Sequence, residues 1–151
     1  GLWVIPAARM KASREHRVPL STEAMELLQS LPRFVPAEGQ PDLLFLGRYG
    51  KALSNSSLRA VLYKQLKISN KVTTVHGLRS SFADWRAEQT TYSHELAEMA
   101  LAHTLGDKTR EAYQRTDMME RRRQMMQDWA RYVTTKQNTA TVTSIKSKSA
   151  A

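Results

Sequence analysis

Two histidines, an arginine and a tyrosine follow one another in a suggestive order in the second half of this chain. They are His76, Arg79, His103 and Tyr113. Residues of these types suit the attack of a tyrosine hydroxyl on a phosphodiester. A phosphodiester resists attack because its oxygens are already negative, so cationic donors must hold the nonbridging oxygens and an acid must protonate the leaving oxygen. Arg79 is the natural clamp, since a guanidinium is planar and always charged.

Each of these residues has an ordinary structural explanation when it is taken alone. His76 suits a helix cap, and Arg79, three residues further on, suits a surface charge on the same helix face. His103 suits the carboxyl end of a helix, where the dipole favours a cation. Tyr113 suits a half-buried packing position, and a nucleophilic tyrosine would need help to lose its proton. The chemical interpretation therefore depends on the joint order of the four residues and on the sequence around them.

The composition is that of a folded domain, or part of one, without membrane or disulfide features. The chain has 151 residues, of which 41% are hydrophobic, and no cysteine. The mean hydropathy is -0.51. No apolar run approaches the length of a bilayer span, and no signal peptide is visible. The lack of cysteine removes disulfides, thiolate nucleophiles and cysteine metal sites, and it fits a reducing, cytoplasmic compartment.

The charge balance points to a polyanionic partner. The formal net charge is +9, and the excess is spread along the chain rather than confined to a tail. Lysine and arginine that neutralise phosphates release counterions, so this bias favours nucleic acid as the partner. No cluster of acidic residues has metal-ligand spacing, which disfavours a two-metal nuclease. We expect no metal and no cofactor.

The hydrophobic pattern predicts a mainly helical fold with a small antiparallel sheet near the N-terminus. Two short strands are expected at 3–5 and 17–20, with a polar hairpin turn between them. Serines at 21, 54 and 93 are expected to cap helices. The expected helices cover 22–31, 55–67, 77–88 and 94–102, a short segment containing Tyr113 and capped by Asp107, and 118–134.

Core faces and boundaries follow from the same pattern. The helix at 77–88 should face inward with Leu78, Phe82 and Trp85. Residues 42–46 read as a short buried segment. An apolar stripe on the last helix, at Met118, Met125, Met126, Trp129 and Val133, can pack on its own domain or on a neighbouring protomer. We expect an ordered domain over 1–134 and a disordered polar tail over 135–151.

Several sequence segments resemble the tyrosine recombinases, and among them the integrases of prophages and genomic islands. The matching segments are HGLRSSFADW at 76–85, LAH at 101–103, AYQR at 112–115 and RRQMMQDWA at 122–130. IPAARMK at 5–11 and HRVPLS at 16–21 resemble the hairpin of the same catalytic domain. The resemblance runs from about residue 3 to residue 133. It implies a tyrosine recombinase catalytic-domain fold.

The resemblance also implies a role for each matching residue. Tyr113 would attack the DNA and form a 3′-phosphotyrosyl bond, and Arg79 would hold the nonbridging oxygens. His103 would donate a hydrogen bond to the same phosphate. His76 would assist proton transfer at the tyrosine, and Lys11 on the hairpin would protonate the leaving 5′-oxygen. The covalent bond conserves the phosphodiester energy, so strand exchange would need neither ATP nor metal.

One part of the family pattern has no match in this sequence. The family carries an additional catalytic arginine upstream of the hairpin, and Arg9 and Arg17 do not fit that position. We therefore expect this chain to be the C-terminal part of a longer integrase that is weakly active or inactive alone. The full-length protein would act on double-stranded DNA attachment sites, as a homotetramer on DNA, with a possible accessory DNA-bending protein. Its expected location is the bacterial cytoplasm, at the nucleoid.

Two other functions remain open at this point. One is DNA relaxation of the type IB topoisomerase kind, which shares the tyrosine and the cationic pocket. The other is a noncatalytic DNA-binding remnant. Further phosphate contacts are expected from exposed basic residues on the hairpin and on the second helix, namely Arg9, Arg14, Arg59 and Lys64.

Overall fold

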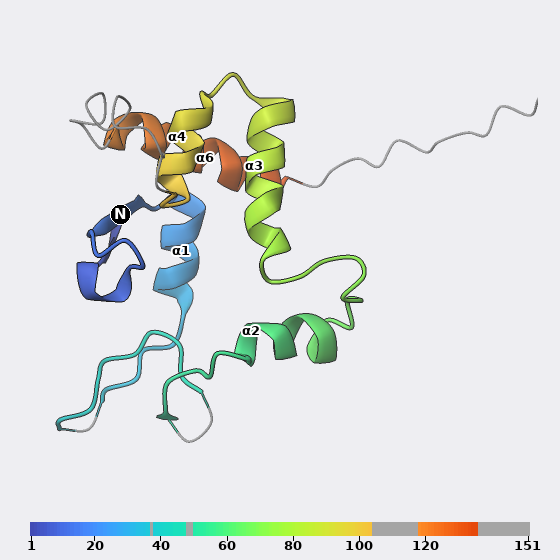
Figure 1. The fold of residues 1–151 in the computed structure, drawn as a ribbon. Helices are drawn as coiled ribbons and strands as arrows, with labels where there is room; N and C mark the ends of the chain where they lie inside the picture. The colour runs from blue at the N-terminus through green and yellow to red at the C-terminus, as the bar shows by residue number, and fades with distance from the viewer. Residues whose placement is uncertain (37, 48–49, 104–117, 136–151) are drawn as a thin grey trace, which may run out of the picture.

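The computed structural model describes residues 1–36, 38–47, 50–103 and 118–135. It confirms a mainly helical fold with a small antiparallel sheet near the N-terminus (Figure 1). Strands β1 (Leu2–Ile5) and β2 (His16–Pro19) pair in the register Trp3 to Val18. The hairpin loop contains the short 3-10 turn η1 (Ala7–Arg9). Pro19 ends β2, as expected for a residue without a backbone donor.

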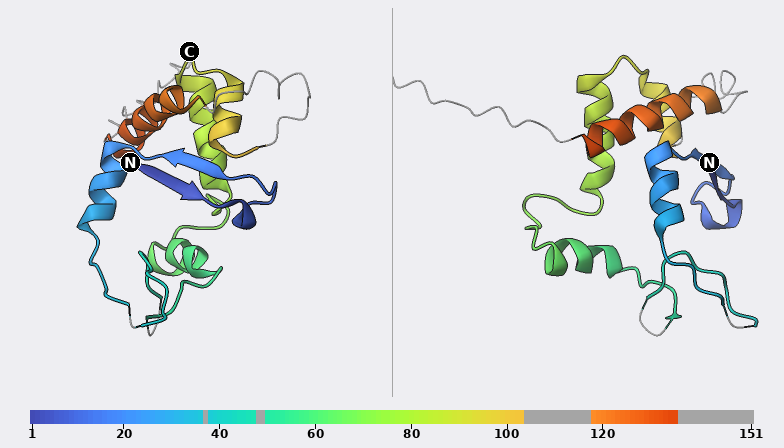
Figure 2. Two further views of the ribbon diagram at one scale, coloured as in Figure 1. Left: turned by 90° about the vertical axis from the view of Figure 1, so that its left-hand side faces the viewer. Right: turned by 180° about the vertical axis from the view of Figure 1, so that it is seen from behind.

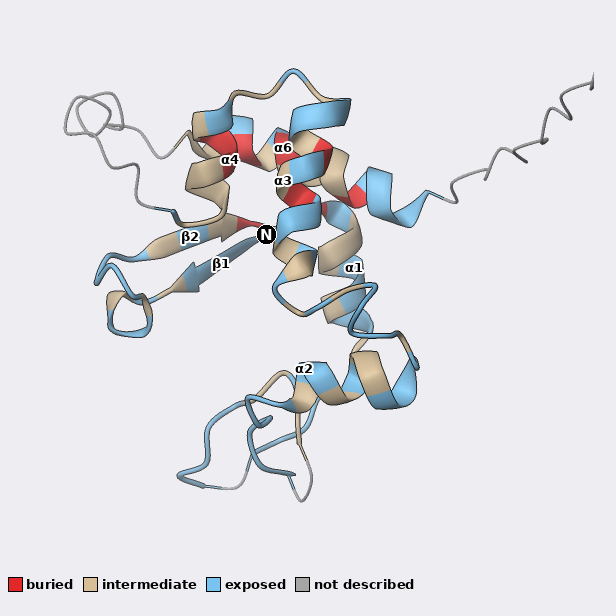
Figure 3. Cartoon of the chain, turned by 45° about the vertical axis from the view of Figure 1, so that its right-hand side comes forward, coloured by how far each residue is buried: buried red, intermediate tan, exposed pale blue. Residues whose placement is uncertain are grey.

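Three helices form the core of the molecule. They are α3 (Gly77–Gln89), α4 (His94–Ala100) and α6 (Met119–Thr134), and α6 runs across the other two (Figures 1 and 2). Leu96 of α4 and Met125 of α6 are fully buried. Burying side chains of this size stabilises the fold by about 1.5–3 kcal/mol each. The core is small and sits where the three helices meet (Figure 3).

An aromatic cluster joins α3 to α6 at this core. The rings of Trp85 and Trp129 lie 5.2 Å apart between centroids. Phe82 meets Trp129 edge-on at 5.5 Å, which is a favoured geometry because the positive ring edge faces the negative face. Tyr132 extends the cluster along α6 by stacking on Trp129 at 5.7 Å. The last helix therefore packs in cis, on the body of its own chain.

Helix α1 (Thr22–Ser30) is fixed to α6 through polar groups at its first turn. The Ser21 hydroxyl accepts a hydrogen bond from the Ala24 N–H at 3.1 Å, which confirms the expected cap. The Thr22 N–H donates to Oε1 of Gln127 on α6 at 2.9 Å. The Gln127 amide in turn donates to the Glu23 carboxylate at 2.8 Å. The start of α1 is thus tied to α6 by side chains more than 100 positions apart in the sequence.

The predicted helix at 55–67 is confirmed over 57–65, but its ends and its inner geometry differ from the prediction. The structure has a single α-helical turn, α2 (Ser57–Ala60), followed by a π-helical segment, η3 (Val61–Gln65). Ser54 does not cap it, because its hydroxyl lies 3.0 Å from those of Ser56 and Ser57 instead. Serine hydroxyls that hydrogen-bond to nearby groups compete with helical backbone geometry. The helix therefore begins at Ser57 rather than at residue 55.

Two predictions about the core are also wrong. Leu78, on the expected core face of α3, is 54% exposed, so that face begins only at Phe82. The segment 42–46 is not buried, since Phe45 is 55% exposed and the segment makes only an isolated bridge from Leu46 to Ala52. A run of apolar residues this short does not reveal whether other parts of the chain cover it.

Arg122 of α6 is a charged residue inside the apolar stripe of that helix. Its exposed fraction is 3%, whereas Val133 at the end of the predicted stripe is 54% exposed. The Arg122 guanidinium donates through Nη2 to the backbone carbonyl of Arg17 in β2. Helix α6 thereby holds the hairpin against the helical core, and α6 and β2 lie in contact.

Three predictions fall outside the described residues. They are the helix containing Tyr113, its cap Asp107 and the disordered tail after Thr135. Among the described helices, none is long and apolar enough to cross a membrane.

Candidate functional site

Arg79 links the start of α3 to the end of α4. It lies in the first turn of α3, which begins after the Thr74 hydroxyl accepts the Gly77 N–H at 2.9 Å. The half-buried Arg79 side chain reaches across to α4, where its Nη2 donates to the backbone carbonyl of Leu101. An arginine has five donors, so one such bond can orient the guanidinium while others stay available for an anion.

His103 follows α4 at a well-defined helix end. The N–H of His103 donates to the carbonyl of Glu98 at 2.9 Å, and the N–H of Ala102 donates to that of Met99 at 3.1 Å. This pair of bonds is the Schellman motif, in which the residue after the C-cap adopts a left-handed conformation. Ala102 is that residue, with a φ of 55°. The turn fixes the backbone of His103 two positions beyond the carbonyl that holds Arg79.

Replacing Ala102 by glycine is expected to stabilise the protein by about 1 kcal/mol. A Cβ at positive φ is strained, and glycine removes that strain. Equilibrium denaturation of the two chains would measure the difference. The control is Ala87→Gly at an exposed position inside α3, where glycine should instead destabilise by about 1 kcal/mol. An equal loss of unfolding free energy in Ala102→Gly and Ala87→Gly would contradict the left-handed geometry at residue 102.

The imidazole of His103 is held by an acidic residue. Its Nδ1 lies 2.8 Å from Oε2 of Glu98, one helical turn back on α4. The Glu98 side chain is only 20% exposed, and that of His103 is 45% exposed. Because Arg79 bonds to the Leu101 carbonyl, two positions before His103, its guanidinium is anchored at the turn that carries His103.

His16 belongs to the same neighbourhood, although its sequence context did not single it out. It lies at the start of β2, half-buried, and a hydrogen bond connects it with the backbone of Ala100 at the end of α4. Burial lowers the pKa of His16, and the positive charges of Arg122 and Arg79 lower it further. The hairpin therefore presents a neutral imidazole to the two arginines. No local sequence pattern predicts this arrangement, because β2 and α3 are far apart along the chain.

His76 sits in a different local environment from Arg79 and His103. It is the residue before α3, its side chain is exposed, and it lines a surface pocket of about 370 Å³. Arg59 and Tyr63 line the same pocket, with the guanidinium 6.0 Å from the tyrosine ring centroid. The Tyr63 hydroxyl donates to the Thr73 carbonyl at 3.4 Å. One predicted phosphate contact, Arg59, is thus next to one predicted catalytic histidine.

The remaining predicted residues are exposed where the structure describes them. Lys11 lies in the hairpin turn, and within the described residues no hydrogen bond or ion pair joins Lys11 or the His76 imidazole to Arg79 or His103. Tyr113 lies outside the described residues. The other predicted DNA contacts, each exposed, are Arg9, Arg14 and Lys64.

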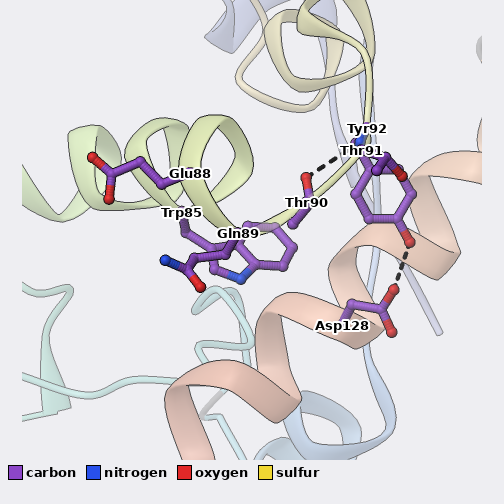
Figure 4. Close-up of a pocket in the computed structure, with 7 residues that line it drawn as sticks. All are labelled: Trp85, Glu88, Gln89, Thr90, Thr91, Tyr92 and Asp128. Carbon is purple, nitrogen blue, oxygen red and sulfur yellow. Dashed lines mark hydrogen bonds between the residues drawn. The ribbon is translucent and has the colours of Figure 1, made fainter.

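A larger surface pocket, of about 620 Å³, lies at the carboxyl end of α3 and includes none of the predicted site residues (Figure 4). Trp85, Tyr92 and Asp128 form part of its lining. The Tyr92 hydroxyl donates to Oδ2 of Asp128 at 2.5 Å, which joins the loop after α3 to α6. Burial, followed by this carboxylate, raises the pKa of Tyr92 to about 12. The geometry is that of a structural clamp between core elements.

Alkaline conditions should destabilise the protein through Tyr92. Its pKa is raised to about 12 in the fold and is about 10 in an unfolded chain. The neutral phenol therefore contributes stability that is complete below pH 10 and lost as pH rises to about 12. Thermal unfolding should show a steeper loss between these values in the wild type than in Tyr92→Phe. Tyr132→Phe, in the same aromatic cluster, is the control, and equal slopes in the wild type and Tyr92→Phe would exclude this role.

Within the described ranges, no group of three histidine or acidic side chains is placed to hold a metal ion. At the junction of α3 and α4, the Arg79 guanidinium bonds to the turn that carries His103.

Comparison with known proteins identifies the family. The model of the phage integrase family matches residues 1–120, and the chain belongs to this family. The prophage integrase IntA of Escherichia coli (strain K12) is 37% identical over 130 residues, covering 85% of this chain. The prophage integrase IntZ of the same strain is 39% identical over 128 residues, or 83% of the chain. The integrase of Enterobacteria phage P4 is 34% identical over 156 residues, or 91% of the chain.

These relatives are much longer than the chain. It spans 30% of IntA, 30% of IntZ and 34% of the phage P4 integrase. No solved structure matches the chain closely enough to be counted as similar.

Proposed function

We propose that this chain carries the cleavage site of a site-specific DNA recombinase that integrates and excises a prophage or genomic island. Tyr113 attacks the phosphorus of a DNA phosphodiester, so a bond forms to the tyrosine oxygen and the bond to the 5′-oxygen breaks. The tyrosine proton leaves with help from His76, and Lys11 supplies a proton to the departing 5′-oxygen. Arg79 and His103 hold the nonbridging oxygens. The product is a 3′-phosphotyrosine and a free 5′-hydroxyl.

The observation that best supports this proposal is the bond between Arg79 and the Leu101 carbonyl beside His103. It anchors the Arg79 guanidinium of α3 to the turn at the end of α4 that carries His103, which is the arrangement that a phosphate clamp of these two residues needs. Preorganised donors of this kind stabilise developing negative charge because they need no rearrangement during the reaction.

The proposed substrate is double-stranded DNA at attachment sites, bound by a homotetramer of the full-length protein. Rejoining reverses the cleavage, since the 5′-hydroxyl of another strand attacks the phosphotyrosine and releases Tyr113. The bond energy is kept throughout, so no ATP or metal is required. An accessory DNA-bending protein is a possible partner.

A further family arginine has no counterpart among residues 1–151, and we expect this chain alone to cleave poorly. A missing clamp residue of this kind costs about 10²- to 10³-fold in rate. Robust cleavage of an attachment-site duplex by the 151-residue chain would refute this part of the proposal.

Covalent trapping tests the proposed function directly. The chain is extended upstream to restore the further arginine and is given nicked duplexes from the DNA that flanks its gene. A protein–DNA adduct that survives denaturation is expected, and Tyr113→Phe should abolish it because the nucleophilic oxygen is absent. Tyr132→Phe is the matched control, since it removes a hydroxyl from an exposed position on α6, apart from the proposed catalytic residues.

The other outcomes identify the alternatives. An adduct that persists in Tyr113→Phe would overturn the assignment of the nucleophile. A folded chain that binds DNA without forming any adduct would favour a noncatalytic binding module. An adduct accompanied by relaxation of supercoils, with no strand exchange, would favour the topoisomerase reaction.

Arg59→Ala should reduce the salt dependence of DNA binding. If Arg59 contacts one phosphate, the slope of log affinity against log salt should fall in magnitude by about 0.9. Fluorescence anisotropy with a duplex over a range of salt concentrations measures this slope. Arg131→Ala on α6 serves as the charge-matched control. An unchanged slope in Arg59→Ala would remove the residue from the DNA interface.

A further inference from the structure

Glu98 holds His103 at two points, and this double attachment is unusual for a surface histidine. The Glu98 carbonyl accepts the backbone N–H of His103 at 2.9 Å. The Glu98 carboxylate contacts Nδ1 of the same residue at 2.8 Å. The backbone contact therefore fixes the position of the His103 main chain, and the carboxylate contact fixes the rotation of its imidazole ring.

The carboxylate also determines which ring nitrogen carries a proton. An ionised carboxylate can only accept hydrogen bonds, so Nδ1 of His103 must be a donor in this contact. Nε2 is then the nitrogen left for a substrate. In a neutral ring Nε2 would be an acceptor, which a phosphate repels, whereas in the imidazolium it is a donor.

The contact is sheltered from solvent on the Glu98 side. The Glu98 side chain is only 20% exposed, whereas that of His103 is 45% exposed. A hydrogen bond to an ionised carboxylate is stronger than one between neutral groups, and a low local dielectric strengthens it further.

We infer that Glu98 is a positioning residue that orients the His103 imidazole, so that Nδ1 donates to the Glu98 carboxylate and Nε2 is left to face a phosphate. This inference rests on the proposed function for the identity of the anion, the DNA phosphate. It does not require Glu98 to touch the DNA. It adds to the site a residue whose charge is opposite to that expected for a DNA-binding surface.

One substitution distinguishes this role of Glu98 from a simple effect of its charge, because the two explanations predict opposite changes in DNA affinity. Removal of a negative charge should strengthen DNA binding by a basic protein. If Glu98 maintains the His103 donor, Glu98→Gln should instead weaken binding at neutral pH by about tenfold, as expected for the loss of one charge-assisted hydrogen bond. Glu88→Gln, at an exposed position on α3, is the matched control and should leave affinity unchanged or slightly higher.

The experiment combines imidazole NMR with binding on the 151-residue chain. Long-range proton–nitrogen spectra distinguish the charged form and both neutral tautomers of each histidine, and His103→Gln identifies the signals of His103. We expect the ring signals of His103 to change in Glu98→Gln, because Nδ1 loses the carboxylate to which it donates. Glu98→Asp keeps the charge but shortens the side chain, so it should change the signals in the same way.

The two readouts keep the inference distinct from the proposed function. His103 signals that are identical in the wild type and Glu98→Gln would overturn the inference, whatever the chain does with DNA. Changed signals together with a tenfold loss of affinity for a short DNA duplex would support both. Changed signals with no loss of affinity in His103→Gln would support the inference and refute the role of His103 at the phosphate.

Discussion

Replacing Arg79 by alanine should lower the rate of covalent adduct formation by about 10²- to 10³-fold. This is the usual cost of removing one preorganised donor from a developing negative charge. The change removes the proposed phosphate clamp and also the bond to the Leu101 carbonyl that joins the start of α3 to the end of α4. Arg79→Lys should recover only part of the rate, because lysine keeps the charge but not the planar, multiple-donor geometry.

The rate of adduct formation in the upstream-extended chain, with a nicked duplex, measures this effect. Arg33→Ala, which removes the same charge from an exposed loop, is the control and should change the rate little. If Arg79→Ala formed the adduct as fast as Arg33→Ala, Arg79 would have no place in the phosphate clamp.

Replacing Arg122 by alanine should lower the free energy of unfolding by about 3 kcal/mol. The Arg122 side chain is 3% exposed, so its truncation leaves a cavity. The substitution also removes the donor of the hydrogen bond to the Arg17 carbonyl. Loss of buried volume and loss of a charge-assisted bond each contribute to a figure of this size. Arg122→Met should cost less, because methionine keeps most of the volume and carries no charge that must be desolvated.

The neighbouring arginine provides the matched control for this prediction. Arg121 is exposed on the same turn of α6, and Arg121→Ala should change the free energy of unfolding by less than about 0.5 kcal/mol. Chemical denaturation of the four chains gives the comparison. Similar values for Arg121→Ala and Arg122→Ala would show that α6 does not hold the hairpin through Arg122.

Local signals in the sequence were enough to predict most of the helices. The hydroxyls of Ser21 and Ser93 cap α1 and α4 in the structure, as expected from their positions before apolar stripes. These caps depend on neighbours within three residues, so a sequence pattern contains all the necessary information. The failure at Ser54 is instructive, because three serines within four positions offered hydroxyl partners that competed with capping.

Burial was harder to predict because it depends on distant segments. Arg122 lies in a run of three arginines that any composition argument places in solvent, yet it packs against a strand 105 positions away. Leu78 is the opposite case, because it continues an apolar pattern in the sequence but its side chain is exposed in the structure. Hydrophobic periodicity shows which residues share a face, not which face another element will cover.

The candidate site was predicted in its residue types but not in its supporting contacts. Arg79 bonds to the turn that carries His103, while Tyr113 lies outside the described residues. Glu98 and His16 were missed because an acidic residue and a strand histidine carry no motif of their own. Only the turn at Ala102 and the pairing of β2 with the helical core bring them to the site.

The aromatic cluster between α3 and α6 gives the protein an optical probe of its own. Two of the three tryptophans, Trp85 and Trp129, lie in that cluster at 5.2 Å, whereas Trp3 is 56% exposed on the hairpin. In Trp3→Phe, the remaining emission would come only from the junction of α3 with the last helix. Coupling between the two indole rings would give a near-ultraviolet circular dichroism signal that vanishes when that helix detaches. Undocking of the C-terminal helix could then be followed in real time without any added label.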